Sequence, residues 1–465
     1  MRNNARVAGS GMRPPEVPAS GLRSKIDPPL MSGFPFFLLL TFTAVTFLNI
    51  PNRFAAVAAV RPTIILVALL TVCIVQQWAV IGSRLTGRES KSLLAIVAYV
   101  IFSLPFVAWP GSVLAPNLEN FVRSIVFYFF VVAFVDSVER LRVFIRVFVS
   151  CQLVRCLEPL ILHFTTGYWG GSTYFSGEEM MRLTGAPSDP VNANGLAFVI
   201  LTTLPFVHYW AAQRRSTFRL CAYVLLVPSL VYALLLTSSR SGLVALGAIV
   251  LGLVWFSRHR ILLLAVLAVS VMITVPQLTE SQRDRYLSLV DHNSKQSATA
   301  EGRITAWGSN FDVFLHRPIF GFGLGTSQEA NYNVVGDVHY AHNLYLEVLI
   351  ELGAIGFMFF MVYLVSILVS ARDVQRAVVS ASNSRDAHTP GILLWLPKSL
   401  LVWIAMCLLF SLASYGLSEY QWYLFGGLAV VTSKFAGNLQ SSTQLPRDAA
   451  VSGIGRRHRS GNFSG

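Results

Sequence analysis

Long apolar blocks limit what this chain can fold into. Runs of roughly 17–25 mostly apolar residues recur along it, and a helix of that length crosses the hydrocarbon core of a bilayer. Only 13% of the residues are charged and 54% are hydrophobic, so a soluble fold would lack the polar surface to cover its core. Alternating strand-like patterns are absent, which argues against an outer-membrane barrel. We therefore predict an all-α polytopic membrane protein in a lipid bilayer.

The length criterion predicts about twelve transmembrane helices. They lie near residues 33–50, 62–82, 92–110, 120–136, 141–164, 193–211, 219–237, 241–257, 260–275, 343–370, 392–413 and 415–433.

The distribution of basic residues predicts the orientation. Arg and Lys gather in the tails and in every second short loop, while the loop Trp109–Glu119 between them holds no basic residue. The basic loops are Ser83–Lys91, Asp136–Arg142, Ala211–Arg219, Ser257–Arg260 and Ala371–Arg376. Basic loops stay in the cytoplasm, so we predict an inner-membrane protein with both termini cytoplasmic. The net charge of +13 then reflects orientation and predicts no nucleic-acid partner.

This topology divides the chain into five parts. Residues 1–32 and 434–465 are predicted to be disordered cytoplasmic tails. Residues 33–275 would hold helices one to nine and residues 343–433 helices ten to twelve. Between them, residues 276–342 form one large periplasmic loop. Within this loop, residues 303–314 are predicted to form a short amphipathic helix.

Three arginines lie at span ends on the predicted outer face, where basic residues are disfavoured. They are Arg182, Arg240 and Arg303. A single arginine could reach the lipid headgroups or pair with a carboxylate. Three, each among small and polar residues, favour another interpretation, because the guanidinium group binds phosphate or pyrophosphate oxygens bidentately. We therefore predict a site for an anionic, lipid-linked substrate.

A histidine pair marks the junction between the loop and the tenth predicted helix. His339 or His342 could cap this helix, as could Asn343. Alternatively, either imidazole could serve as a general base, for which the predicted site offers no other plausible group. Glu347 lies four residues after Asn343 and Glu351 four further on, so the three share a helix face. These carboxylates either hold helices together or orient the histidine.

Other polar features have simpler interpretations. Arg155 and Glu158 are three residues apart and are expected to pair within their helix, and Arg123 could add to a phosphate site. The glycines at 321, 323 and 325 lack the context of a phosphate loop. The remaining intramembrane ionisable residues are Arg146 and Lys398. The five cysteines lie in apolar runs and show no metal-ligand spacing, so we expect neither disulfides nor a metal site.

Three motifs together resemble one family. They are GRITAW…RPIFGFGLGTSQEANYN…HYAHNLYLEVLIELGAIGF, SSRSGLVAL and RLTGAPSDPVNANGLA. In this order, with about twelve spans and a large outer loop before the tenth, they resemble the bacterial superfamily of O-antigen ligases and of O-antigen and exopolysaccharide polymerases.

The resemblance implies a membrane glycosyltransferase of lipopolysaccharide or exopolysaccharide biosynthesis. It would move a glycan from undecaprenyl pyrophosphate to a hydroxyl of an acceptor glycan or of the lipid A core at the periplasmic face, with no cofactor and no metal. By motif, Arg240 and Arg303 would bind the pyrophosphate and His342 would activate the acceptor hydroxyl. Arg182 and Asn194 match a further motif. His339, Asn343 and Glu347 would support the site.

Some questions stay open at the level of sequence. The His-Tyr-Ala-His-Asn order departs from many ligases, which leaves ligase and polymerase both open. Aromatic side chains could stack on sugar rings or anchor the chain at the membrane interface; they are Trp307, Phe322, Tyr332 and Tyr340. A transporter or flippase of a lipid-linked glycan is the alternative function. It predicts charges along a central path, whereas most unexplained charges here lie at the outer face.

Overall fold

The computed structural model describes residues 33–175, 178–212, 216–257, 259–289, 298–336, 342–382, 390–414 and 416–437. Its longer helices are α1 (Gly33–Phe47), α4 (Pro62–Gln76), α6 (Arg88–Ser103), α8 (Leu118–Phe134), α9 (Val138–Thr166), α10 (Ala193–Ala212), α11 (Thr217–Leu236), α12 (Arg240–Phe256), α13 (Arg260–Thr274), α15 (Ala298–His316), α17 (Leu344–Ser382) and α18 (Gly391–Phe410). A further helix spans residues 420–437. The shorter helices are α2 (Ile50–Arg53), α3 (Ala55–Val60), α5 (Trp78–Ile81), α7 (Pro110–Ser112), α14 (Glu280–Leu287) and α16 (Ser327–Val335).

A helix overlaps each of the predicted spans, and the fold is nearly all-α. By length and composition, 5 of the described helices could cross a membrane, or up to 6 if one bent pair is a single span. That pair is the second predicted span, which is bent by 78° between Pro62–Gln76 and Trp78–Leu85. A helical membrane protein is therefore supported, while the number of twelve spans stays a prediction.

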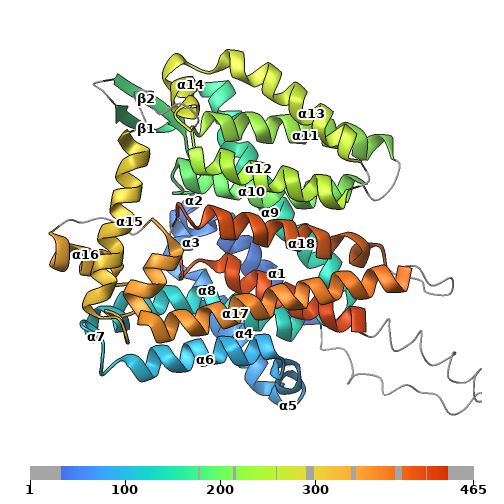
Figure 1. The fold of residues 1–465 in the computed structure, drawn as a ribbon. Coiled ribbons are helices and arrows are strands. Elements are labelled where there is room, and N and C mark those ends of the chain that lie inside the picture. Colours follow the sequence, from blue (N-terminus) through green and yellow to red (C-terminus); the bar gives the residue numbers. More distant parts are fainter. Residues whose placement is uncertain are drawn as a thin grey trace, which may run out of the picture.

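The helices form one bundle with two different ends (Figure 1). α18 packs against α10, α12 and α17, and α17 packs on its other side against α6. At one end lie the only two strands of the described chain, β1 (Gly170–Phe175) and β2 (Glu178–Leu183), with α14, α15 and α16. We call this the cap end. The C-terminal end of α10 and the N-terminal end of α11 lie at the opposite end of the bundle (Figure 1).

Two connecting segments of the cap end contain regular secondary structure. The predicted periplasmic loop 276–342 contains α14, α15 and α16, and the expected short helix 303–314 is the longer α15. The segment before α10 contains an antiparallel strand pair, in which Arg182 lies opposite Gly171. The fold is thus not purely helical. Backbone hydrogen bonds between β1 and β2 hold the chain around Arg182 in place.

The glycine-rich segment after α15 packs into a break in α17. Gly353 interrupts this helix with φ 66° and ψ −174°. Across the break, the Phe322 amide donates to the Ile350 carbonyl at 2.8 Å, and the Ala354 amide donates to the Pro318 carbonyl at 2.8 Å. A Cβ at Gly353 would lie 2.2 Å from the Ile319 oxygen. The glycines therefore permit close backbone approach and serve no phosphate loop.

Replacement of Gly353 by alanine should destabilise the protein. The residue would keep a left-handed conformation that costs about 1–3 kcal/mol, and its Cβ would also clash with the Ile319 carbonyl. We expect a clearly lower midpoint of thermal unfolding in detergent. Gly247→Ala is the matched control, because nothing lies within 4 Å of a Cβ at Gly247 in α12. Equal midpoints for both variants would contradict this account of the break.

Reporter fusions test the predicted orientation. We expect a phosphatase that folds only outside the cytoplasm to be active when fused after Gln277, which precedes α14 at the cap end. The same reporter fused after Ser257, between α12 and α13, should be inactive. The reverse pattern of activity would mean that the cap end faces the cytoplasm.

Candidate functional site

Two of the predicted arginines meet at the turn between α11 and α12. The Arg182 side chain reaches this turn from β2, and its Nε donates to the Thr237 carbonyl at 2.9 Å. Its Nη2 donates to Asn194 Oδ1 at 3.0 Å, so Asn194 orients the same guanidinium group. Arg240 begins α12 three residues after Thr237, and Ser239 caps this helix by accepting from the Gly242 amide. Two of the three sequence motifs are thereby joined at one turn.

Helix α14 adds a third arginine to this turn. Arg285 Nε donates to the Ser238 carbonyl at 2.7 Å. Arg240 is buried, and its Nη1 donates to Ser288 Oγ at 3.1 Å. Ser288 in turn donates to the Arg285 carbonyl at 2.8 Å. We call Arg182, Arg240 and Arg285 the arginine cluster. These residues come from β2, α12 and α14, and they lie around the turn at residues 237–240.

Tyr286 fills the space beneath this turn. Its hydroxyl donates to the Leu235 carbonyl at 2.9 Å. Burial raises the pKa of Tyr286, while the nearby Arg182 and Arg285 act in the opposite direction. The raised pKa keeps the phenol protonated at neutral pH, so it adds no negative charge and the cluster keeps its positive charge for an anionic ligand.

The predicted histidine and its neighbours form a second group at the start of α17. His342 is exposed and adopts a left-handed conformation with φ 45°. Asn343 caps the helix, because its Oδ1 accepts from the amides of Tyr345 at 3.0 Å and Leu346 at 3.3 Å. His339 lies outside the described residues.

The two carboxylates on this helix hold loops in place. Glu347 accepts from the amides of Gly416 at 2.8 Å and Leu417 at 3.1 Å. Glu351 accepts from the Gly325 amide at 2.8 Å. Of the two roles considered for them, these contacts support the structural one.

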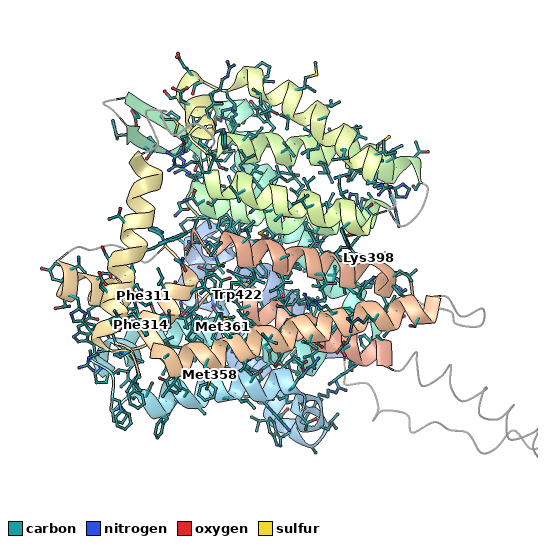
Figure 2. The ribbon with its side chains drawn as sticks, in the orientation of Figure 1. Phe311, Phe314, Met358, Met361, Lys398 and Trp422 are labelled. Carbon is teal, nitrogen blue, oxygen red and sulfur yellow. The ribbon has the colours of Figure 1, made fainter. Side chains whose placement is uncertain are left out.

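Helix α15 carries Arg303 along the cap end, although the Arg303 side chain lies outside the described part of the structure. α15 packs against α16 and α17, and Asn331 of α16 donates to Asn310 of α15 at 2.9 Å. Phe311 and Phe314 lie near the lower end of α15 (Figure 2), where Phe314 is buried and Phe311 is 45% exposed. Lys398 lies far from them, toward the opposite end (Figure 2).

The predicted pair between Arg155 and Glu158 is wrong. Arg155 binds Asp189 bidentately, through Nε at 2.6 Å and Nη2 at 3.1 Å. Glu158 instead pairs with both terminal nitrogens of Arg53, one of them at 2.7 Å. Each of the two charges thus has its ion-pair partner outside α9: Asp189 in the loop before α10, and Arg53 at the end of α2.

Two further residues do not take the roles considered for them. Arg123 pairs with Glu119 one turn away, and both side chains are more than half exposed. Phe322 is buried and stacks on Trp109 at a centroid distance of 5.4 Å. It therefore packs the core beneath α15, and of the aromatic residues considered for sugar stacking only Tyr332 is described as largely exposed.

Sequence reasoning missed Arg285 and Arg53. Both are arginines on the predicted outer face, the same signal that identified Arg182, Arg240 and Arg303. Arg285 lies within TESQRDRYL, a segment whose Thr279 and Gln282 form a capping box. That motif was a usable sign of an ordered helix in the loop.

The described residues contain no group of three or more His, Cys, Asp or Glu side chains that could hold a metal ion. The five cysteines are free, and three of them are buried.

Comparison with known proteins finds a family likeness in the central part of the chain. A family model described as O-antigen ligase matches residues 222–361. This segment contains Arg240, Arg285, Arg303 and His342, whereas Arg182 and Asn194 precede it. The predicted resemblance to the O-antigen ligase and polymerase superfamily is thereby confirmed. A search of curated proteins finds no match to the chain.

Removal of Arg155 should unfold the cap end more than removal of an exposed arginine. Arg155→Ala leaves Asp189 buried without its partner, a loss that typically costs about 3–5 kcal/mol. Arg123→Ala is the matched control, because exposed pairs contribute at most about 1 kcal/mol. We expect a lower thermal midpoint and faster amide exchange in residues 184–192 for Arg155→Ala alone. Similar behaviour of both variants would contradict the structural role of the Arg155–Asp189 pair.

Proposed function

Because residues 222–361 match a family model described as O-antigen ligase, we propose that this membrane protein transfers a glycan from undecaprenyl pyrophosphate to an acceptor hydroxyl. The reaction would take place at the periplasmic face, in the biosynthesis of a cell-surface polysaccharide. The acceptor is a second glycan or the lipid A core. The observation that carries the proposal is the arginine cluster at the 237–240 turn, most of it inside the matched segment.

The cluster suits a pyrophosphate. Two of its guanidinium groups donate to backbone carbonyls of the turn, and the third donates to Ser288. These contacts fix the groups in advance, so little ordering remains when a ligand binds. Guanidinium stays charged at any relevant pH and binds phosphate oxygens in fixed geometry. Arg182 and Arg240 are proposed to bind the pyrophosphate, together with Arg303 from α15.

Backbone conformation gives independent support. Ser238, in the turn before Arg240, and His342, before α17, both have positive φ, at 51° and 45°. Non-glycine residues rarely adopt this region, and such conformations cluster at functional sites. Ser238 lies two residues before Arg240, and His342 is itself one of the residues assigned from the family motifs.

The proposed chemistry is one displacement. An acceptor hydroxyl oxygen attacks the anomeric carbon, its bond to that carbon forms, and the bond from carbon to the pyrophosphate oxygen breaks. The electron pair leaves with undecaprenyl pyrophosphate, whose charge the arginines stabilise. The hydroxyl proton passes to the imidazole of His342. A single displacement inverts the anomeric centre.

Transport is the less favoured alternative. A transporter needs polar groups along a path through the membrane. Here Arg182, Arg240 and Arg285 are gathered at one turn, and the buried charges of α9 are paired with Arg53 and Asp189. The ligase-family match also supports transfer.

Single alanine variants test the proposal. We expect Arg240→Ala and Arg303→Ala to lower transfer by about 100- to 1,000-fold, because each removes a group that stabilises the leaving charge. His342→Ala should lower it by about 100- to 10,000-fold, the usual contribution of a general base. The measurement is surface glycan of host cells in which the chain supplies the only such activity.

Arg123→Ala serves as the control for these variants, since Arg123 is an exposed arginine paired on its own helix. All variants must first be shown to insert in the membrane. Normal glycan in well-inserted Arg240, Arg303 and His342 variants would refute the mechanism. Accumulated single lipid-linked repeats would identify a polymerase, and long lipid-linked chains without attachment would identify a ligase.

A further inference from the structure

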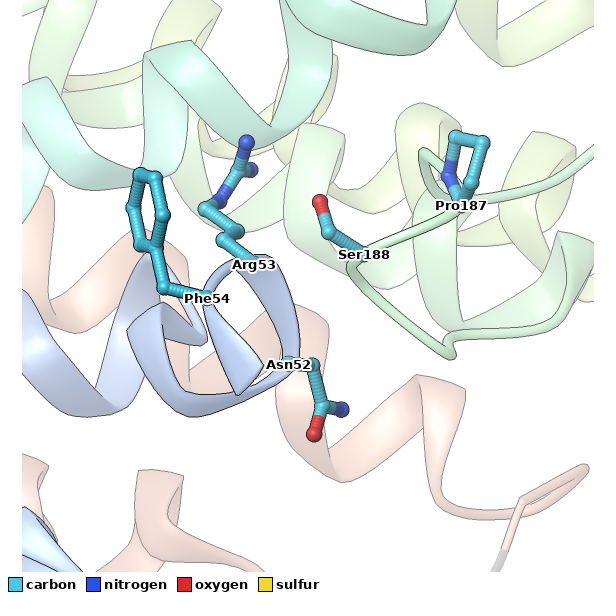
Figure 3. Close-up of a pocket in the computed structure, with 5 residues that line it drawn as sticks. All are labelled: Asn52, Arg53, Phe54, Pro187 and Ser188. Atoms are coloured by element: carbon cyan, nitrogen blue, oxygen red, sulfur yellow. The ribbon is translucent and has the colours of Figure 1, made fainter. Parts of the chain in front are cut away.

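A pocket lies at the cap end, away from the residues assigned above. Its volume is about 420 Å³, within the range of roughly 300–1,000 Å³ common for small-ligand sites. One wall is the short helix α2 and the residue after it, and the other is the loop between β2 and α10. Figure 3 shows the lining residues, which are Asn52, Arg53, Phe54, Pro187 and Ser188.

Both walls of the pocket are linked to α9 by ion pairs. Arg53 of the first wall pairs with Glu158, and its Nε also donates to the Leu48 carbonyl at 2.6 Å. Asp189 of the second wall pairs with Arg155. Since Arg155 and Glu158 are one helical turn apart, a single helix fixes the distance between the walls. The separation of the two walls is therefore set by the fold.

The lining groups suit an uncharged, polyhydroxylated ligand. The charge of Arg53 is balanced by Glu158, so the pocket offers no unpaired charge to an anion. The side-chain amide of Asn52 and the Ser188 hydroxyl make no hydrogen bond to any described residue, and both can donate and accept. The Phe54 side chain is 57% exposed, and an aromatic ring packs well against the apolar face of a sugar.

The pocket is also within reach of the arginine cluster. Ser188 follows Arg182 by only six residues, so at most about 20 Å of chain separates them. The same loop continues to Asn194, which binds Arg182. A glycan of a few sugar residues is long enough to cover this distance.

We propose that this pocket binds a sugar residue of the glycan substrate while the arginine cluster holds the pyrophosphate. The inference rests on the proposed function and extends it, since it gives the enzyme a means to select the glycan as well as the lipid carrier. The sugar belongs either to the donor or to the acceptor, which share this chemistry.

Binding measurements on the full chain in lipid nanodiscs test the proposal. The probes are undecaprenyl pyrophosphate alone and undecaprenyl pyrophosphate carrying the host's glycan repeat. Ser188→Phe fills the pocket and should weaken binding of the glycan-bearing lipid by about tenfold or more, with binding of the bare lipid unchanged. Asn52→Ala should produce a smaller loss in the same direction.

Ser172→Phe is the matched control, because Ser172 is an exposed serine of β1 at the same end. If donor binding is unchanged but the KM for free acceptor glycan rises about tenfold, the pocket holds the acceptor sugar and the proposal stands. Equal losses for both lipids, or no change in any of these quantities, would overturn it. Failure of the wild-type chain to bind bare undecaprenyl pyrophosphate would instead refute the proposed function.

Discussion

The break in α17 at Gly353 is the constraint on which the cap end depends. A helix interrupted within a bundle leaves backbone groups that must find partners inside the protein. The segment from Pro318 to Gly323 supplies them, and Glu351 binds the Gly325 amide that follows. Because this segment joins α15 to α16, the break fixes both helices against α17. Arg303 on α15 and His342 before α17 therefore owe their relative arrangement to backbone bonds between two glycine-containing segments.

The charges of α9 hold the other half of the cap end. Arg155 and Glu158 are costly to place in a hydrophobic bundle unless each is paired and hydrogen-bonded. Their partners come from the two walls of the pocket: Asp189 from the loop between β2 and α10, and Arg53 from the short helix α2. The two ion pairs thus contribute little net stability. Their main effect is to hold two segments that lack long regular structure in position against α9.

Much of this could be predicted from the sequence. Helix positions follow from the length of apolar runs, and Arg182 and Arg240 were found because arginines are unusual at that face. The partners were not predictable, since Asp189 is 34 residues from Arg155 and Gly416 is 69 from Glu347, and local spacing carries no information on such contacts. The strand pair around Arg182 was missed because its two strands, GGSTYF and EEMMRL, show no alternation of apolar and polar residues.

Four non-glycine residues of the described chain have positive φ, and each adjoins a turn or cap in a connecting segment: Asn49, Arg61, Ser238 and His342. Such conformations persist only where the surroundings impose them. The local sequence of these connections does not favour the shape that they adopt. A peptide cut from any one of them would relax to another conformation, so the shape of these connections exists only as a property of the assembled bundle.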